Sequence, residues 1–289
     1  MQNSFTQSAS KSVDFPNVVL PSVAVPQAQI LTACDLPTKS AIRELENATN
    51  LISEAQSAKV DAPTLSVIIP AYNESKTILR VLEAVEQLKV TKQIIIVDDG
   101  STDGTRDIIR DLNGRRGIDV VLHQRNSGKG AAIQTGVRLA VGEIVIVQDA
   151  DLEYNPHDIL SVIQPILDGE SDVVFGSRYL ANCHQDQSAL HRFGNAFLTG
   201  FSNWMTHQRL TDMETCYKAF RRELIQSIPI EQQRFGFEPE ITAKLAKKKI
   251  IIREVPITYK SRSWQEGKKI GVKDLVSTLW CIVRYRFQR

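Results

Sequence analysis

The sequence has few cysteines and no cysteine pair at metal-binding spacing. Cys34, Cys183, Cys216 and Cys281 are scattered over 289 residues, which excludes a CxxC zinc site and a disulfide framework. We therefore expect a reducing, cytoplasmic compartment. Long apolar runs are also lacking, since no stretch approaches the ~18 to 20 apolar residues of a membrane-spanning helix. The polar start Met1–Ser4 lacks the pattern of a signal peptide, so we expect neither a secreted nor an integral membrane protein.

The chain also lacks a large net charge of either sign, because it has 35 Lys and Arg and 33 Asp and Glu. Residues 244–289 nevertheless carry 13 Lys and Arg and only three acidic residues. Such a basic segment suits an anionic membrane surface, a phosphorylated substrate or a nucleic acid, or is simply a solvated face. Since no nucleic-acid-binding module is present, we expect no nucleic-acid partner.

Residues 1–60 read as an N-terminal extension. Residues 1–35 are rich in Ser, Gln, Val and Pro without a sustained period, which predicts an irregular leader. Apolar residues then recur at three-to-four spacing from Thr38 to Ala55, which predicts an amphipathic helix.

Residues 61–289 read as one α/β domain, because short apolar runs alternate with helical patterns. The predicted strands are Leu65–Ile69, Gln93–Val97, Asp119–Leu122 and Glu143–Val147, and the predicted helices are residues 74–88, 105–112 and 130–140. This order predicts a Rossmann-like domain with a mostly parallel central sheet flanked by helices. Ligands bind at the carboxyl ends of such strands, so the loops that follow them are the candidate sites.

Three carboxylates follow the fourth predicted strand on alternate residues, Asp149, Asp151 and Glu153. Alternation aims them to one side if the extended strand continues. Mg²⁺ or Mn²⁺ would relieve their repulsion and bridge to phosphate oxygens. A solvated acidic loop is the alternative, but the position after a parallel strand favours a metal.

Two further loops carry polar residues. Asp99 is placed to accept hydrogen bonds from a ribose or base, whereas Asn73 and Ser101 suit helix capping. The segment Gly128–Gly130 lacks the GxxxxGK[ST] spacing, which disfavours a Walker-type NTPase. The helix that begins near Lys129 would still favour an anion at its N-terminus.

The chain resembles family 2 glycosyltransferases with the GT-A fold in four motifs, Pro70–Glu74, Val97–Thr105, Asn126–Ala132 and Asp149–Glu153. It resembles the dolichol-phosphate mannose synthase branch in four more, Phe175–Arg178, Thr211–Asp212, Phe235–Glu238 and Arg262–Lys268. Members of that branch transfer a hexose to a polyprenyl phosphate. The resemblance covers about residues 64–289.

The resemblance implies roles for the matching residues. Those that would hold the nucleotide-sugar are Pro70, Tyr72, Glu74, Val97, Asp99, Lys129, Asp149, Ala150, Arg262 and Lys268. Asp151 and Glu153 would ligate the metal, although relatives often carry Gln at the second place. The implied catalytic set is Asp151, Arg178, Arg192 and Asp212, with the two arginines on the acceptor phosphate. Relatives often read Ser-Gly-Phe-Arg where this chain has Thr215–Lys218, so acceptor or sugar contacts are expected to differ.

The implied reaction is inverting transfer of a hexose from a GDP-mannose-type or UDP-glucose-type donor to a polyprenyl or dolichyl phosphate. A phosphate acceptor, with a second pKa of about 6, is already ionised and needs cations rather than a base. Arg178 and Arg192 suit that task, because guanidinium groups bind phosphate in a bidentate way.

Other functions stay open at this point. Transfer to a soluble or protein hydroxyl would need a carboxylate base. A nucleotidyltransferase and a non-enzymatic nucleotide-binding module are further alternatives. A lipid acceptor would be reached by a peripheral protein at the cytoplasmic membrane face, and residues 275–287, which mix apolar and basic side chains, suit either a membrane interface or packing on the domain.

Overall fold

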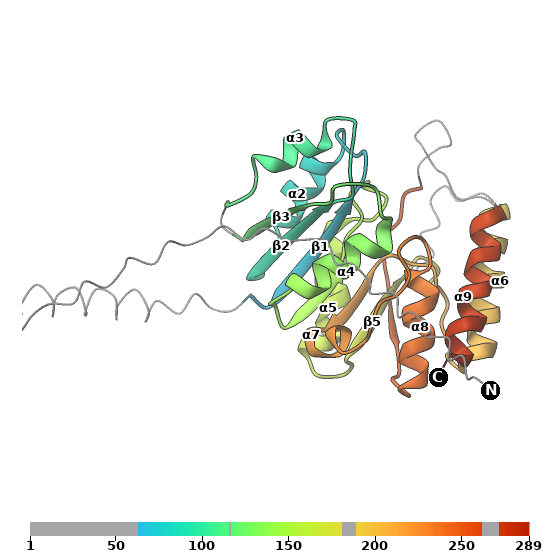
Figure 1. The fold of residues 1–289 in the computed structure, drawn as a ribbon. Coiled ribbons are helices and arrows are strands. Elements are labelled where there is room, and N and C mark those ends of the chain that lie inside the picture. Colours follow the sequence, from blue (N-terminus) through green and yellow to red (C-terminus); the bar gives the residue numbers. More distant parts are fainter. Residues whose placement is uncertain (1–62, 116, 181–188, 262–271, 289) are drawn as a thin grey trace, which may run out of the picture. The chain divides into compact units, whose positions relative to one another are not determined.

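The computed structural model describes residues 63–115, 117–180, 189–261 and 272–288. The predicted leader and the helix predicted over residues 38–55 lie outside the described residues. Within the described residues, seven strands form one sheet in the order β3-β2-β1-β4-β6-β5-β7 (Figure 1). The strands are β1 Leu65–Ala71, β2 Lys92–Asp98, β3 Ile118–Leu122, β4 Ile144–Val147, β5 Val173–Ser177, β6 Lys218–Arg221 and β7 Arg253–Pro256.

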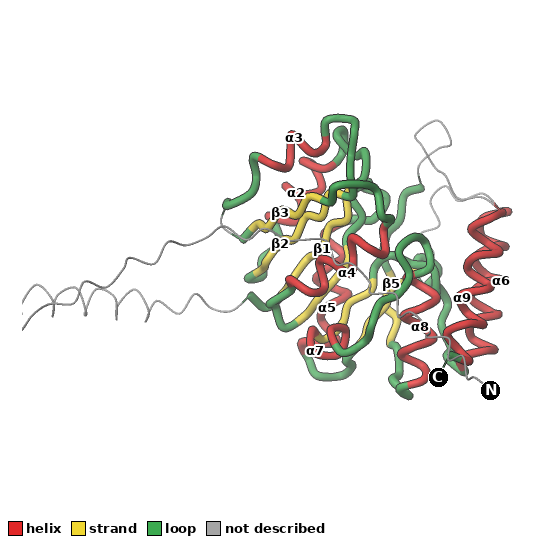
Figure 2. The backbone as a smooth tube through the Cα atoms, in the orientation of Figure 1, coloured by secondary structure: helices red, strands yellow, loops and turns green. Residues whose placement is uncertain are grey.

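Helices connect and cover these strands (Figure 2). They are α2 Ile78–Glu86, α3 Thr105–Arg110, α4 Lys129–Leu139, α5 Ile159–Leu167, α6 Ala189–Thr206, α7 Arg222–Gln226, α8 Phe237–Lys247 and α9 Val272–Phe287, with a 3₁₀ turn at Pro156–Asp158. The four predicted strands and the three helices predicted between them are therefore confirmed, with boundaries that shift by a few residues. The largest shift is at α2, which begins at Ile78 rather than Glu74 because residues 72–77 form turns.

The sheet is parallel except at β6, which runs antiparallel to both β4 and β5. The central strands are buried on both faces, as their continuous β-branched runs predict. Gly136 of α4 packs directly on Ile68 of β1, where a Cβ atom would meet the Ile68 side chain. Glycine at this position therefore lets α4 approach the sheet closely.

Helices α6 and α9 lie side by side at one edge of the domain (Figure 1). Their C-terminal ends meet, because Arg286 Nε donates to the Met205 carbonyl at 2.7 Å. α9 also packs on α8 and buries Cys281, Ile282 and Tyr285. No helix among the described residues is long and apolar enough to cross a bilayer.

Both helices leave large apolar side chains in solvent at a spacing of three, four or seven residues. The exposed set is Phe193 (71%), Phe197 (50%) and Trp204 (71%) on α6 and Val276 (60%), Trp280 (53%), Val283 (41%) and Phe287 (71%) on α9. We call these seven residues the aromatic face. Single exposed apolar residues are ordinary, whereas a row of them along one side of a helix is typical of an interaction surface.

Candidate active site

The polar segments meet at one edge of the sheet for a topological reason. All strands except β6 point the same way, so the loops after β4, β5 and β7 emerge at the same edge. Because β6 is antiparallel, residues 212–217, which precede it, enter at that edge too. The strand order changes direction between β1 and β4, which is where open α/β sheets bind ligands.

The acidic loop 149–153 turns instead of continuing β4. The strand ends at Val147, and Leu152 adopts a left-handed backbone with φ of 63°, an unusual conformation for a bulky residue. Glu153 N donates to Asp151 Oδ1 at 3.1 Å within this turn. The extended strand on which the sequence argument for three aligned carboxylates depended is therefore absent, and the turn at Leu152 decides where they point.

Lys129 forms an ion pair with Asp149, the first carboxylate of the acidic loop. Its Nζ lies 2.8 Å from Asp149 Oδ1, 3.5 Å from Glu238 Oε1 and 3.4 Å from Cys216 Sγ. Burial acts to lower the pKa of Lys129, but the Asp149 carboxylate and its other partners raise it well above its ordinary value. Lys129 is therefore a cation at neutral pH that neutralises Asp149.

Glu153 is oriented by Tyr259, whose hydroxyl donates to Glu153 Oε2 at 2.6 Å. Burial and the adjacent Glu153 carboxylate raise the pKa of Tyr259 far above its usual range, so the hydroxyl stays protonated and remains a donor. The described residues contain no preformed cage of three His, Cys, Asp or Glu groups. Asp151 and Glu153 nevertheless present the oxygen donors that Mg²⁺ and Mn²⁺ prefer, and they fit an ion that takes further ligands from a diphosphate and water.

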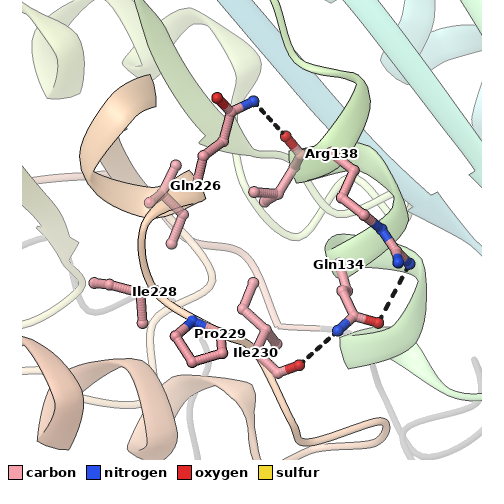
Figure 3. Close-up of a pocket in the computed structure, with 8 residues that line it drawn as sticks. Gln134, Arg138, Gln226, Ile228, Pro229 and Ile230 are labelled. Atoms are coloured by element: carbon pink, nitrogen blue, oxygen red, sulfur yellow. Dashed lines mark hydrogen bonds between the residues drawn. The ribbon is translucent and has the colours of Figure 1, made fainter.

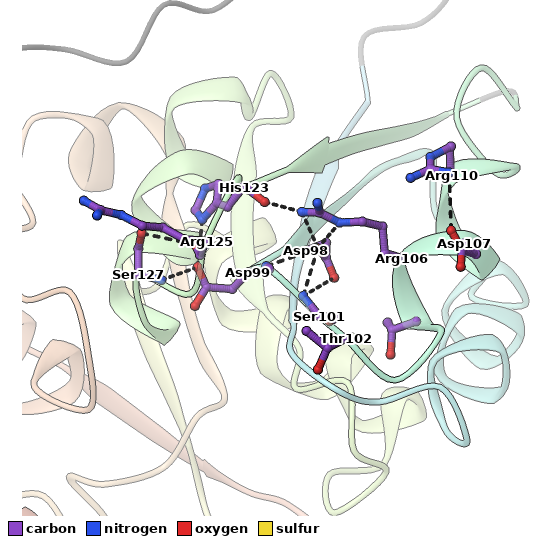
Figure 4. Close-up of polar contacts among 12 residues, drawn as sticks. Asp98, Asp99, Ser101, Thr102, Arg106, Asp107, Arg110, His123, Arg125 and Ser127 are labelled. Carbon is purple, nitrogen blue, oxygen red and sulfur yellow. Dashed lines mark hydrogen bonds and ion pairs between the residues drawn. The ribbon is translucent and has the colours of Figure 1, made fainter.

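The loop after β2 is tied to the loop after β3 (Figure 4). Asp99 accepts hydrogen bonds from Ser127 N (2.9 Å) and Gly128 N (2.6 Å), and its Oδ1 lies 2.8 Å from His123 Nδ1. The side chain predicted to meet a ribose or base thus already has three protein partners. His123 had no predicted role, because nothing local in the sequence pairs it with a residue 24 positions earlier.

The N-terminus of α4 is not open to an anion. Gly130 N donates to the Arg234 carbonyl (3.3 Å) and Ala131 N to the Gln233 carbonyl (3.0 Å). A Cβ atom at Gly128 or Gly130 would collide with the backbone of this same segment. The glycines therefore serve close backbone packing, and the anion site expected at this helix end is replaced by protein carbonyls.

The loop after β1 places its predicted residues next to the loop after β2. Pro70 and Val97 are paired across β1 and β2, and the exposed Tyr72 follows β1 directly. Asn73 Oδ1 accepts from Thr102 N (2.8 Å), and Glu74 N donates to Thr105 Oγ1 (2.9 Å). Asn73 thus joins two loops, and the helix capping suggested for it is wrong, because α2 begins at Ile78 with Thr77 as its N-cap residue.

Arg178 and Asp212 form a buried ion pair. Arg178 Nε lies 2.6 Å from Asp212 Oδ2 and Nη2 lies 2.7 Å from Oδ1, and the Arg178 backbone N also donates to Oδ2 (3.1 Å). Asn195 of α6 joins through Nδ2 to Asp212 Oδ1 (3.3 Å). Asp212 is therefore committed to holding Arg178 and is poorly suited to accept a substrate proton.

Glu254 of β7 binds the segment that carries Asp212. Its Oε1 accepts from Asp212 N (3.0 Å), and its Oε2 accepts from Thr211 N (2.7 Å) and Thr211 Oγ1 (2.9 Å). Burial raises the pKa of Glu254, and the hydrogen bonds from Thr211 and Asp212 oppose that rise. Thr211 and Asp212 are thus both hydrogen-bonded to Glu254 of β7, and Asp212 is also hydrogen-bonded to Arg178.

The remaining predicted residues are only partly placed. Ala150 is buried within the acidic loop, and Arg192 is exposed on α6. Arg262 and Lys268 lie outside the described residues. The structure therefore brings together the loops after β1, β2, β4 and β5, and it does not test the contacts predicted for these two cations.

A partly buried acid, Glu214, and a buried base, Lys218, were missed from the sequence. Burial first, and then the neighbouring Glu238, raise the pKa of Glu214 to about 8, and its Oε1 has no hydrogen-bond partner. Lys218 donates to the carbonyls of Met213 (2.8 Å) and Thr215 (2.5 Å), and burial lowers its pKa to about 8. The only sequence signal was the departure of Thr215–Lys218 from the pattern of relatives.

A separate pocket lies away from this site (Figure 3). It is lined by the second half of α4 and by residues 225–230, where Gln134 Nε2 donates to the Ile230 carbonyl. The C-terminal half of α4 and the start of α7 lie toward the amino ends of the parallel strands. This pocket is therefore not part of the catalytic edge.

The strand order, with the acidic loop at the switch point of the sheet, is that of the GT-A fold. The chain belongs to glycosyl transferase family 2, whose family model matches residues 66–228.

Its relatives include enzymes named for lipid phosphates. The undecaprenyl-phosphate 4-deoxy-4-formamido-L-arabinose transferase of Aeromonas hydrophila is 30% identical over 230 residues, which cover 77% of this chain and 68% of the relative. The dolichol-phosphate mannosyltransferase of Pyrococcus furiosus is 27% identical over 72% of this chain and 59% of its own length. The glycosyltransferase AglJ of Haloferax volcanii is 30% identical over 68% of this chain and 63% of its own length. This chain thus spans about two thirds or less of these three relatives.

Solved structures share the fold at lower identity. Glucosyl-3-phosphoglycerate synthase from Mycobacterium tuberculosis in complex with Mn²⁺, UDP and phosphoglyceric acid has a TM-score of 0.60 and 20% identity, over 81% of this chain and 80% of that chain. The same enzyme with UDP alone has a TM-score of 0.58 and 22% identity over 81% and 82%. At this identity the likeness establishes the fold.

Proposed function

We propose that this glycosyltransferase is a metal-dependent, inverting hexosyltransferase that moves a hexose from a nucleotide-sugar to a polyprenyl phosphate at a membrane surface. The catalytic domain comprises residues 61–289, and residues 1–60 are an extension of it. The names of the curated relatives support a lipid-phosphate acceptor. The protein acts as a peripheral protein on the cytoplasmic face of the membrane.

One observation carries the choice of a lipid acceptor. Helix α6 contributes Asn195 to the Arg178–Asp212 pair and, on the same helix, Phe193, Phe197 and Trp204 to the aromatic face. An arginine suited to phosphate therefore lies beside a helix whose exposed side is apolar and aromatic. A polyprenyl phosphate combines the same two chemistries in one molecule, and aromatic helices with flanking arginines bind membrane interfaces.

The donor side follows from the acidic loop. Mg²⁺ or Mn²⁺ held by Asp151 and Glu153 would supply charge neutralisation for the departing nucleoside diphosphate. Asp149 and Ala150 border the nucleotide, and Lys129 keeps Asp149 from competing for the metal. The loops with Pro70, Tyr72, Glu74, Val97 and Asp99 frame the nucleotide, and Arg262 and Lys268 meet its phosphates.

The acceptor side needs cations rather than a proton acceptor. Arg178 Nε and Nη2 are held by Asp212, which fixes the guanidinium plane and leaves its remaining edge for a phosphate oxygen. Arg192 approaches the same phosphate from α6. A single displacement at the anomeric carbon then inverts its configuration.

A transfer assay tests this function. Radiolabelled UDP- and GDP-sugars are incubated with polyprenyl phosphate in detergent, with Mg²⁺, with Mn²⁺ or with EDTA. We expect a lipid product that mild acid hydrolyses, formed with one metal and lost with EDTA. Asp151→Asn should reduce the rate by more than about 100-fold, because it removes a metal ligand. Absence of lipid product across all donors would refute the proposal.

A soluble phosphorylated acceptor is the second candidate. It is favoured by the structural likeness to an enzyme crystallised with phosphoglyceric acid. The same assay with 3-phosphoglycerate in place of the lipid separates the two, because a water-soluble product without any lipid phosphate would support this candidate instead.

A further inference from the structure

Tyr259 touches both halves of the proposed site. Its hydroxyl donates to Glu153 Oε2 at 2.6 Å, on the metal side. The Arg178 guanidinium carbon lies 5.1 Å from the centre of its ring, on the acceptor side. Tyr259 itself is 9% exposed, so both contacts are shielded from solvent.

We infer that Tyr259 is a positioning residue that couples the metal ligand Glu153 to the phosphate-binding Arg178. The inference rests on the proposed function, which assigns those two roles. It adds a residue that touches neither the metal nor the substrate and sets the geometry of both binding groups. Loss of the hydroxyl and loss of the ring should therefore have separable effects.

The backbone around Tyr259 gives it the rigidity that such a role requires. Tyr154 and Tyr259 form an isolated antiparallel bridge, and Lys260 N donates to the Glu153 carbonyl at 2.9 Å. Thr258 N donates to Asp158 Oδ2 at 2.7 Å. Backbone hydrogen bonds thus hold the segment after β7 next to residues 153–158. They keep the Tyr259 hydroxyl within hydrogen-bonding distance of Glu153.

The ring of Tyr259 is held between aromatic and cationic neighbours. Tyr154 packs edge-on against it with ring centres 5.1 Å apart, and Tyr154 in turn stacks on Tyr217 at 4.8 Å. The Arg178 guanidinium lies over the Tyr259 ring, and its Nε and Nη2 atoms donate hydrogen bonds to Asp212. The guanidinium is therefore fixed by a carboxylate in its plane and by an aromatic ring over its face.

The two contacts predict different losses. A hydrogen bond to a ligating carboxylate orients the ligand, and removing such a partner typically weakens metal binding by about 10- to 100-fold. A cation over an aromatic face in a shielded site contributes an attraction whose loss corresponds to about 3- to 30-fold in affinity. Tyr259→Phe removes only the first contact, and Tyr259→Leu removes both.

The metal arm is measured without turnover. Mn²⁺ is titrated into the full chain in parallel with saturating UDP and with saturating GDP, and free Mn²⁺ is read by electron paramagnetic resonance. We expect Tyr259→Phe to weaken Mn²⁺ binding by about tenfold and Glu153→Gln to weaken it at least as much. The matched control is Tyr285→Phe, because Tyr285 is also buried, also has one hydroxyl hydrogen bond, with Gln232 Nε2 at 2.8 Å, and also has a cation over its ring. It should bind Mn²⁺ like the wild type.

The acceptor arm uses steady-state kinetics at saturating Mn²⁺. Tyr259→Phe should keep the KM for polyprenyl phosphate within about twofold of wild type, because its ring still faces Arg178. Tyr259→Leu should raise that KM by about tenfold. A melting temperature for each variant checks that the fold is retained.

Two results separate the possible failures. If Glu153→Gln weakens Mn²⁺ binding but Tyr259→Phe does not, the coupling is refuted and the proposed function stands. If Glu153→Gln binds Mn²⁺ like the wild type, the metal assignment in the proposed function is wrong, and the inference falls with it. Equal KM values for Tyr259→Phe and Tyr259→Leu would refute the acceptor half.

Discussion

Both carboxylate oxygens of Asp212 accept hydrogen bonds from Arg178, from Nε at 2.6 Å and from Nη2 at 2.7 Å. The Arg178 side chain is 12% exposed and that of Asp212 is fully buried. The Asp212 carboxylate raises the pKa of the Arg178 guanidinium, although burial alone would lower it. The Arg178 guanidinium is therefore a permanent cation that Asp212 holds in one orientation.

Asp212→Ala should destabilise the protein by about 3–5 kcal/mol, because it leaves a buried guanidinium without its counter-charge. Urea unfolding measures this change. The double variant Arg178→Met with Asp212→Leu should recover much of the loss, since it buries no unpaired charge. Asp107→Ala, which breaks an exposed pair with Arg110, should change stability little. Equal effects of Asp212→Ala and Asp107→Ala would contradict the prediction.

Glu214 predicts a pH dependence of stability. Its pKa is raised from 4.5 to about 8, by burial first and then by Glu238 and Asp212, while Lys218 and Arg178 act in the opposite direction. Because the folded-state pKa lies above the unfolded one, protonated Glu214 stabilises the fold fully below about pH 4.5. That contribution is lost progressively as the pH rises toward about 8.

Glu214→Gln should therefore become more stable than wild type as the pH rises from 5 to 8, by at most about 1.4 kcal/mol per pH unit. Urea midpoints at several pH values in that range measure the difference. The measurements stay at or below pH 8, because the lowered pKa of Lys218 in the wild type adds a pH dependence of the opposite sign above that value. Parallel pH curves for the two proteins would count against the burial of this carboxyl.

Gly130→Ala should destabilise the protein by about 1–3 kcal/mol, because its Cβ atom would collide with the Gln232 carbonyl. Gly200→Ala is the matched control. It also places a methyl group on a helical glycine, but no atom lies within 4 Å of the new Cβ atom. It should stabilise α6 by about 0.5–1 kcal/mol. Thermal unfolding measures both changes in stability. If Gly130→Ala stabilised the protein, residues 232–234 could not pack against Gly130.

Trp204→Ser combined with Trp280→Ser should weaken binding to vesicles by at least about tenfold, because each Trp would bury apolar surface in the membrane. Sedimentation with vesicles that contain anionic lipid measures the partitioning. Ile251→Ser is the control, since Ile251 is 82% exposed but lies just before β7 and outside the aromatic face. Equal binding by the double variant and the wild type would exclude the aromatic face as the membrane contact.

Local patterns were sufficient for the first half of the domain. Continuous β-branched runs such as Leu65–Ile69 favour buried strands, and the carboxylates at 149–153 follow such a run directly. The sequence also showed that residues 275–287 mix apolar and basic side chains. It did not show that Trp280 and Phe287 face solvent while Cys281 and Tyr285 face α8, because periodicity does not say which side of a helix the domain covers.

Only the tertiary structure showed that β6 is antiparallel and which contacts follow from its direction. Reversal of one strand brings Asp212–Tyr217 to the catalytic edge, where Asp212 meets Arg178 and Cys216 meets Lys129. These partners are 34 and 87 residues apart, and no local rule connects them. The amino-acid sequence by itself determined the first four strands, the acidic loop and the family. Tertiary packing alone decided which charges are paired, because pairing depends on burial and on distances between segments remote in the chain.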